Sequence, residues 1–94
     1  MKYTASRLSK DNKLFPTEII LEANGITVRV PGVFNSKSEY MEYGYITSVS
    51  VDTPLVGFST ITFYTSGTHV SAHGFTKEEV KEIKEAIDKG KNSH

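Results

Sequence analysis

An Asn-Gly pair between two alternating runs constrains the fold of this chain more than any other feature. In TEIILEANGITVRV, residues 17–30, apolar side chains recur at every second position on both sides of Asn24-Gly25. Asn-Gly favours a two-residue type I′ turn, because both central residues of that turn need positive φ. Counting outward from the turn predicts an antiparallel hairpin with one buried apolar face, formed by the pairs Ala23–Ile26, Leu21–Val28 and Ile19–Val30.

A second hairpin is predicted in FSTITFYTSGTHVSAHG, residues 58–74, with its turn at Ser66-Gly67. Counting outward places Phe63–Val70 and Ile61–Ala72 on the inner face. The outer face then carries three polar pairs: Tyr64–His69, Thr62–Ser71 and Thr60–His73. Between the two hairpins, residues 39–52 predict two short strands broken near Gly44.

Three signals in the C-terminal segment agree on one helix start. Thr76 is a suitable N-cap, Glu79 completes a capping box with it, and Phe75 is placed to pack on Val80 as a hydrophobic staple. The spacing predicts a helix over 77–89, about 20 Å long, that ends at Gly90 in a left-handed conformation. The apolar stripe of this helix is formed by Val80, Ile83, Ala86 and Ile87. This stripe must cover part of a sheet.

The composition is that of one small folded domain. The chain has 94 residues, of which 37% are hydrophobic and 23% are charged, and its formal net charge is +0. No whole-molecule field therefore attracts it to nucleic acid, and nucleic-acid binding is not expected. The absence of cysteine excludes disulfides and thiol chemistry. We expect residues 1–16 to form a basic N-terminal arm, residues 17–94 to form the domain, and no segment to be a secretory signal or a transmembrane span.

Four segments between Thr17 and Lys89 follow one another in an order typical of one family. They are the first hairpin with its continuation, EIILEANGITVRVPGVF; the step Tyr45-Ile46-Thr47-Ser48-Val49; the crossing loop Leu55-Val56-Gly57-Phe58; and FYTSGTHVSAHGFTKEEVKEIKEAI. This order resembles that of bacterial pleckstrin-homology-like (PH-like) domains. The resemblance implies an α+β fold, in which a strongly bent antiparallel half-barrel of six or seven strands is capped by one C-terminal amphipathic helix. Together with the missing export signal, the resemblance also implies a bacterial protein of the cytoplasm, either free in the cytoplasm or bound at the periphery of the membrane.

No group of residues in the sequence is typical of an active site or a metal site. His69 and His73 share one strand face, but they are about 13 Å apart along an extended chain, which is too far for one metal ion. Ser71 lies in no nucleophile elbow and has no acid on the same element. The acidic residues of the helix alternate with lysines, as on a solvated face. We therefore expect no enzymatic activity, no metal and no cofactor.

Apolar and aromatic side chains provide the candidate binding residues. The crossing loop has two interpretations, because its side chains either cap the core or form an exposed contact for a partner or a second copy. Tyr40, Tyr43 and Tyr45 likewise either pack across strands or form a contact surface. The candidate binding residues are those of the loop and several polar strand positions: Pro54, Leu55, Val56, Phe58, Tyr64, His69, His73 and Arg29.

These features favour a non-enzymatic interaction or scaffold module that binds protein or peptide, or associates with itself. A half-barrel leaves a strand edge beside a helix, which is the geometry of strand addition, and identical edges can also pair symmetrically. The alternative is a membrane adaptor that binds a lipid headgroup or another anion, as the resemblance and the basic arm suggest. Family members that bind inositol phospholipids carry several Lys and Arg near the first hairpin, whereas this chain has only Arg29 there.

Overall fold

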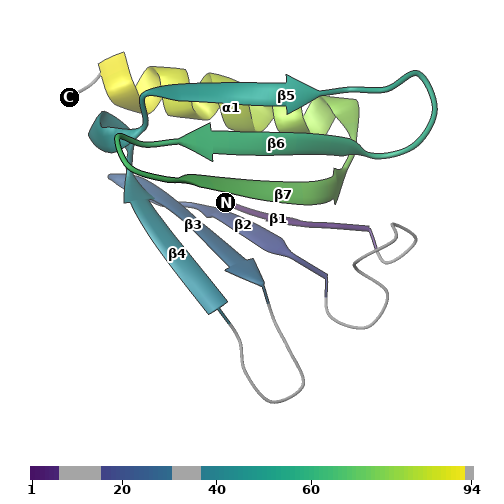
Figure 1. The fold of residues 1–94 in the computed structure, drawn as a ribbon, viewed down its shortest axis with the longest axis horizontal. Coiled ribbons are helices and arrows are strands. Elements are labelled where there is room, and N and C mark those ends of the chain that lie inside the picture. Colours follow the sequence, from purple (N-terminus) through teal and green to yellow (C-terminus); the bar gives the residue numbers. More distant parts are fainter. Residues whose placement is uncertain (7–15, 31–36, 93–94) are drawn as a thin grey trace.

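The computed structural model describes residues 1–6, 16–30 and 37–92. It is an α+β fold with a four-stranded sheet, a three-stranded sheet and one C-terminal helix (Figure 1). The elements are β1 (Lys2–Thr4), β2 (Glu18–Leu21), β3 (Gly25–Val30), β4 (Lys37–Glu42), the 3-10 helix η1 (Tyr43–Tyr45), β5 (Ser48–Asp52), β6 (Ser59–Tyr64), β7 (His69–Phe75) and α1 (Lys77–Asn92). The predicted α+β class, with strands first and a terminal helix, is confirmed.

Both sheets are antiparallel meanders, in the orders β1-β2-β3-β4 and β5-β6-β7. They approach each other where the Ser6 N–H donates a hydrogen bond of 2.8 Å to the Gly74 carbonyl. Within the described residues no strand ladder joins the two sheets, so no barrel closes. The helix α1 packs against η1 and β6, and Figure 1 shows it running behind the three-stranded sheet, antiparallel to β5.

The core lies between the two sheets and α1. The largest side chains with less than 2% exposure come from all three layers: Ile19, Ile26, Val28, Ile46, Ile61, Phe63, Phe75, Val80, Ile83 and Ile87. The strand residues among them follow period two, and the helix residues follow period 3.6, as the apolar patterns predict. Burial of these side chains is the main favourable contribution to folding.

The second hairpin has the predicted register. Ile61 pairs with Ala72, Phe63 with Val70 and Tyr64 with His69. A hydrogen bond of 2.9 Å from the Thr65 N–H to the Thr68 carbonyl closes the turn around Ser66-Gly67.

The first hairpin keeps its predicted face, but its predicted register is wrong by two residues. Ile19 pairs with Val28 and Leu21 with Ile26, and the Glu22 N–H bonds the Gly25 carbonyl at 2.8 Å. The turn residues are therefore Ala23 and Asn24, and neither has positive φ. Because a shift of two preserves side-chain parity, Ile19, Ile26 and Val28 are still buried. Ala23 and Val30, at the two ends of the predicted apolar face, are exposed.

Gly25 explains the shift, because it serves close packing and not the turn. It is the first residue of β3 and pairs with Glu42 of β4. A Cβ atom at this position would overlap the Met41 carbonyl oxygen and the Tyr40 ring. The absence of a side chain therefore allows β4 to cross close to the start of β3.

The start of α1 is as predicted. The Thr76 N–H donates to Glu79 Oε1 at 2.9 Å, and the Glu79 N–H donates to Thr76 Oγ1 at 3.1 Å, which is a complete capping box. Phe75 and Val80 both lie in the core cluster.

The end of α1 differs from the prediction. The helix continues through Gly90 to Asn92, and Gly90 does not have positive φ. A Cβ atom on Gly90 would overlap the ring of Tyr43, so this glycine allows η1 to approach the helix closely.

The prediction of an N-terminal arm is wrong for the first residues of the chain. Lys2–Thr4 form the strand β1, which pairs with β2, and the Ala5 N–H extends the pairing by donating to the Thr17 carbonyl at 2.8 Å. Tyr3 and Ala5 are buried. Three residues are too few to show an alternating pattern, which is why the sequence did not indicate a strand. Residues 7–15 of the predicted arm lie outside the described residues.

Candidate interaction surface

The strand β5 forms a free edge of the three-stranded sheet. It pairs with β6 on one side, and in the described part of the chain no strand pairs with its other side. Only Val49 is half-buried, and the other four residues of the strand are exposed. Such an edge presents a row of unpaired N–H and C=O groups to another chain.

The edge strand β4 of the four-stranded sheet is protected by charge, whereas β5 is not. Lys37, Glu39 and Glu42 place three charges along the six residues of β4. The sequence of β5 is SVSVD, in which the only charge is at the last position. Charged side chains are a common means of preventing edge pairing in folded proteins. The β4 and β5 edges therefore differ in how readily they would accept another strand.

The loop after β5 carries the most exposed apolar side chains of the crossing segment. Leu55 is 95% exposed and Val56 is 89% exposed. Pro54 is also exposed and Phe58 is half-buried, while Gly57 has a φ of 103°. We call β5 and residues 53–57 together the β5 edge surface. Large exposed apolar side chains next to a free edge are typical of a contact site.

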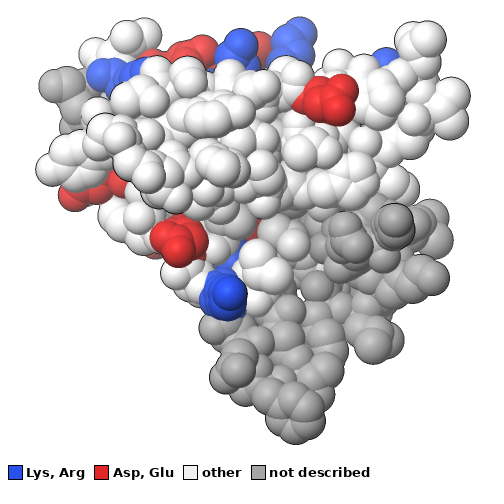
Figure 2. Space-filling model, viewed as in Figure 1, with Lys and Arg blue, Asp and Glu red and all other residues white. Residues whose placement is uncertain are grey.

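The polar candidates lie on the outer face of the three-stranded sheet, which Figure 2 shows to be largely free of charged side chains. The rings of Tyr64 and His69 are 5.9 Å apart between centroids. His73 Nδ1 lies 2.7 Å from Thr60 Oγ1. These contacts are cross-strand pairs of one hairpin, as the register requires.

Arg29 does not join the other candidates. It lies on the four-stranded sheet, where its guanidinium is 3.2 Å from Glu18. Glu18 also pairs with Lys2 at 3.4 Å. The basic group near the first hairpin is thus engaged by a carboxylate of the same sheet.

The tyrosines of the middle segment divide between the two interpretations. Tyr43 is buried, and its hydroxyl donates a hydrogen bond of 2.7 Å to the Glu22 carbonyl. Burial raises its pKa above the ordinary value of 10.0, and electrostatic interactions with Tyr40 and Glu22 raise the pKa further. Tyr40 is 51% exposed and Tyr45 is 68% exposed.

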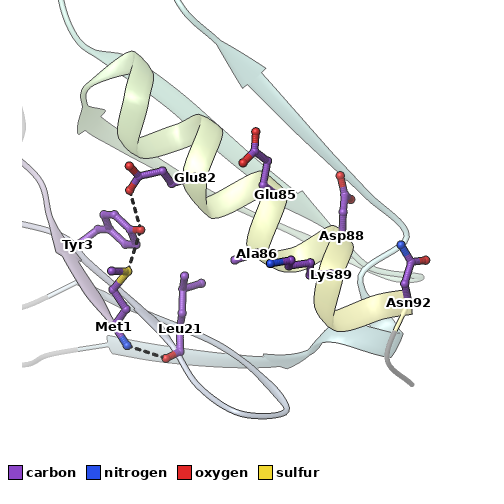
Figure 3. Close-up of a pocket in the computed structure, with 9 residues that line it drawn as sticks. All are labelled: Met1, Tyr3, Leu21, Glu82, Glu85, Ala86, Asp88, Lys89 and Asn92. Carbon is purple, nitrogen blue, oxygen red and sulfur yellow. Dashed lines mark hydrogen bonds between the residues drawn. The ribbon is translucent and has the colours of Figure 1, made fainter.

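A hollow lies between α1 and the start of the chain (Figure 3). Its volume is about 650 Å³, and it is lined by Met1, Tyr3, Leu21, Glu82, Glu85, Ala86, Asp88, Lys89 and Asn92. The Tyr3 hydroxyl donates a hydrogen bond of 2.9 Å to Glu82 Oε1, and the Met1 sulfur lies 3.0 Å from the same hydroxyl. No sequence pattern indicates this hollow, because it depends on β1.

The hollow has an acidic wall formed by one side of α1. Burial raises the pKa of Tyr3 above 10.0, and the hydrogen bond to Glu82 and the negative charges of Glu82 and Glu79 raise it further. These carboxylates are not arranged for a metal, since no group of three His, Cys, Asp or Glu among the described residues could hold one.

The helix α1 is not long and apolar enough to cross a membrane, and it is the only α-helix in the described residues. Comparisons of the chain with protein-family models, with curated proteins and with solved structures found no match in any of the three.

Proposed function

We propose that this protein is a PH-like interaction module that binds an extended polypeptide segment as an added strand along β5. Antiparallel strands followed by one C-terminal helix are the element order that the PH-like resemblance implies. That order supports the family proposal at the level of topology. The proposal of a binding role rests on the surface itself.

The single observation that carries the binding role is the unprotected edge of β5. Main-chain hydrogen bonds from an added strand would satisfy the outward N–H and C=O groups, and alternate side chains would supply specificity. Val51, which is 37% exposed, and the neighbouring Leu55 and Val56 offer apolar area beside those hydrogen bonds. Apolar contact next to the edge stabilises an added strand that would otherwise be held by backbone bonds alone.

A displayed library of random seven-residue peptides tests this function. Peptides selected on the protein should shift the amide NMR signals of residues 48–52 and protect these amides from hydrogen exchange. Val51→Lys should abolish binding of the selected peptides, because a lysine on an edge strand opposes pairing.

Ser38→Lys is the matched control, since Ser38 is an exposed residue of β4, an edge strand of the four-stranded sheet. It adds the same charge to the other sheet and should leave binding unchanged. Selected peptides that shift signals elsewhere, or that bind the Val51→Lys variant as well as the parent protein, would contradict strand addition at β5.

A further inference from the structure

The two most exposed tyrosines of the chain, Tyr40 and Tyr45, line one hollow at the edge of β4. This hollow has a volume of about 440 Å³ and lies between β4, η1 and the turn that joins β6 to β7. We call it the tyrosine hollow. It is lined by Glu39, Tyr40, Met41, Glu42, Tyr45, Thr65, Ser66 and Thr68.

The wall of the tyrosine hollow is negative. Glu39 and Glu42 are exposed, and neither forms an ion pair with a described residue. In the described part of the chain no Lys, Arg or His lines the hollow. Residues 43–51 and 53–75 contain no Asp, Glu, Lys or Arg, so η1 and the second hairpin add no formal charge. Figure 2 shows carboxylates on the surface over β4.

The basic residues near β4 do not neutralise both carboxylates. Lys37 begins β4, and its Cα lies about 7 Å from that of Glu39 and about 17 Å from that of Glu42 along an extended strand. Arg29, on the neighbouring strand, is engaged by Glu18. Two carboxylates against the one ammonium group of Lys37 leave one net negative charge on β4.

The basic residues of α1 do not line the tyrosine hollow either. The helix approaches η1 at Gly90, against the buried Tyr43. Lys89 lines the other hollow, which Figure 3 shows. Lys91 is half-buried, and Asp88 precedes it by three residues, so this pair adds no net charge.

Backbone acceptors also face the tyrosine hollow. The Tyr43 N–H bonds the Asn24 carbonyl, and the Met41 carbonyl oxygen lies toward β3. Because successive residues of a strand direct their backbone groups to opposite sides, the carbonyls of Tyr40 and Glu42 point to the free edge of β4. The hydroxyl groups of the turn between β6 and β7 add further acceptors.

We infer that the tyrosine hollow binds an arginine side chain of a partner polypeptide. A guanidinium group is a planar cation with five N–H donors that stacks on aromatic rings and pairs with carboxylates. Here Tyr40 and Tyr45 supply the rings, the two glutamates supply the opposite charge, and the carbonyl and hydroxyl oxygens accept the remaining donors. A quaternary ammonium ion has no N–H group to donate to these acceptors. The inference does not depend on strand addition at β5.

The open shape of the hollow favours a polypeptide over a free small molecule. Both tyrosines are more than half exposed, whereas a small-molecule pocket buries about 70–90% of its ligand. Affinity must therefore also come from contacts around the hollow, which the residues flanking an arginine provide. Arginine and tyrosine are both enriched at protein interfaces.

Two displayed libraries of seven-residue peptides test the inference, one with arginine fixed at the central position and one with glutamine fixed there. Peptides selected from the arginine library should shift the amide NMR signals of residues 39–45 and 65–68, and peptides from the glutamine library should not. One such arginine peptide is then synthesised with citrulline, the neutral analogue of arginine, and with lysine. The citrulline version should bind about tenfold more weakly, because it loses the charge, and the lysine version about threefold more weakly.

Variants of the protein separate the two sources of affinity. Tyr45→Leu keeps an apolar side chain without the aromatic ring, and should weaken binding of the arginine peptide about fivefold. Glu39→Gln with Glu42→Gln should weaken it about tenfold, and the loss should be smaller in 0.5 M NaCl. The matched control is Glu78→Gln with Glu85→Gln, two exposed residues of α1, which removes the same charge and should have little effect.

Several results would overturn the inference. Citrulline or lysine peptides that bind as tightly as the arginine peptide would exclude recognition of a guanidinium group. N-acetyl-arginine amide or tetramethylammonium that binds these residues as tightly as the peptide would show a site for a free small cation. Arginine peptides that shift only residues outside 39–45 and 65–68 would place the contact elsewhere. Strand addition at β5 is judged separately, by the signals of residues 48–52.

Discussion

Replacing Gly90 with alanine should destabilise this protein, although the same change stabilises most helix interiors. Alanine is favoured over glycine in a helix by about 1 kcal/mol. Here, however, the new Cβ would overlap the ring of Tyr43, including atoms close to its backbone. The ring cannot move away freely, because it is buried and its hydroxyl is bonded to the Glu22 carbonyl at 2.7 Å.

The expected cost exceeds the gain in helix propensity. Overpacking in a core costs about 1–3 kcal/mol, and loss of the Tyr43 hydrogen bond adds about 1 kcal/mol. After the gain from alanine is subtracted, Gly90→Ala should lower the free energy of unfolding by about 1–3 kcal/mol. For a domain of this size each kcal/mol lowers the Tm by about 4–8 °C.

Urea denaturation and calorimetry measure this change in stability. Two further variants test whether the overlap with Tyr43 is its cause. Gly44→Ala is the control, since a Cβ there meets nothing within 4 Å, and it should change stability by less than about 0.5 kcal/mol. In a Tyr43→Ala background the sign should reverse, so that Gly90→Ala stabilises by about 1 kcal/mol. Stabilisation by Gly90→Ala alone would refute the reasoning.

Three further predictions concern titration, helix capping and a buried hydroxyl. The pKa values of Tyr3 and Tyr43 are raised above 10.0, so their contribution to stability is complete below pH 10 and is lost as pH rises through the folded pKa. Tyr3→Phe and Tyr43→Phe should each remove a late component from the phenolate absorbance titration, and a parent titration complete near pH 10 would contradict this. Thr76→Ala should lower the free energy of unfolding by about 1 kcal/mol in urea, because it removes the cap on Glu79, whereas Thr76→Ser should retain it. Ser59 is buried and its hydroxyl makes no hydrogen bond within the described residues, so Ser59→Ala should raise the Tm by an amount that corresponds to about 1 kcal/mol.

The two hairpins show what an alternating pattern can and cannot predict. Period two fixes which face is buried, and this was correct in both hairpins. Period two does not distinguish registers that differ by two residues, so the register must be predicted from the turn residues. The Ser66-Gly67 turn predicted the register of the second hairpin correctly. The Asn24-Gly25 turn predicted the wrong register for the first hairpin, because Gly25 is needed where Tyr40 and Met41 approach the strand.

Gly90 also differs from its predicted role as a left-handed helix terminus, for the same physical reason. Glycine near a helix end usually supplies a left-handed residue, but here it admits the Tyr43 ring. A single sequence contains no information on which distant residue approaches a glycine. The approaching residues come from Tyr40–Tyr43, far from both glycines in the chain.

The candidate site was predictable only in part. Leu55 and Val56 stand out in the sequence as apolar residues in a loop, and the structure places both in the exposed loop. The edge character of β5 depends on the strand order of the sheet, which the sequence pattern does not define. The hollow beside Tyr3 depends on β1, whose three residues are too short for periodicity to reveal.

The contacts of Tyr43 also affect the local opening of the end of α1 and of the first hairpin. Its N–H donates to the Asn24 carbonyl at 3.0 Å, its hydroxyl holds Glu22, and its ring lies on Gly90 in the last turns of α1. Helix ends normally fray, with opening free energies near zero. Here the last turns of the helix and the tip of the first hairpin both contact Tyr43. Both should therefore open together, and their backbone amides should exchange slowly as one unit.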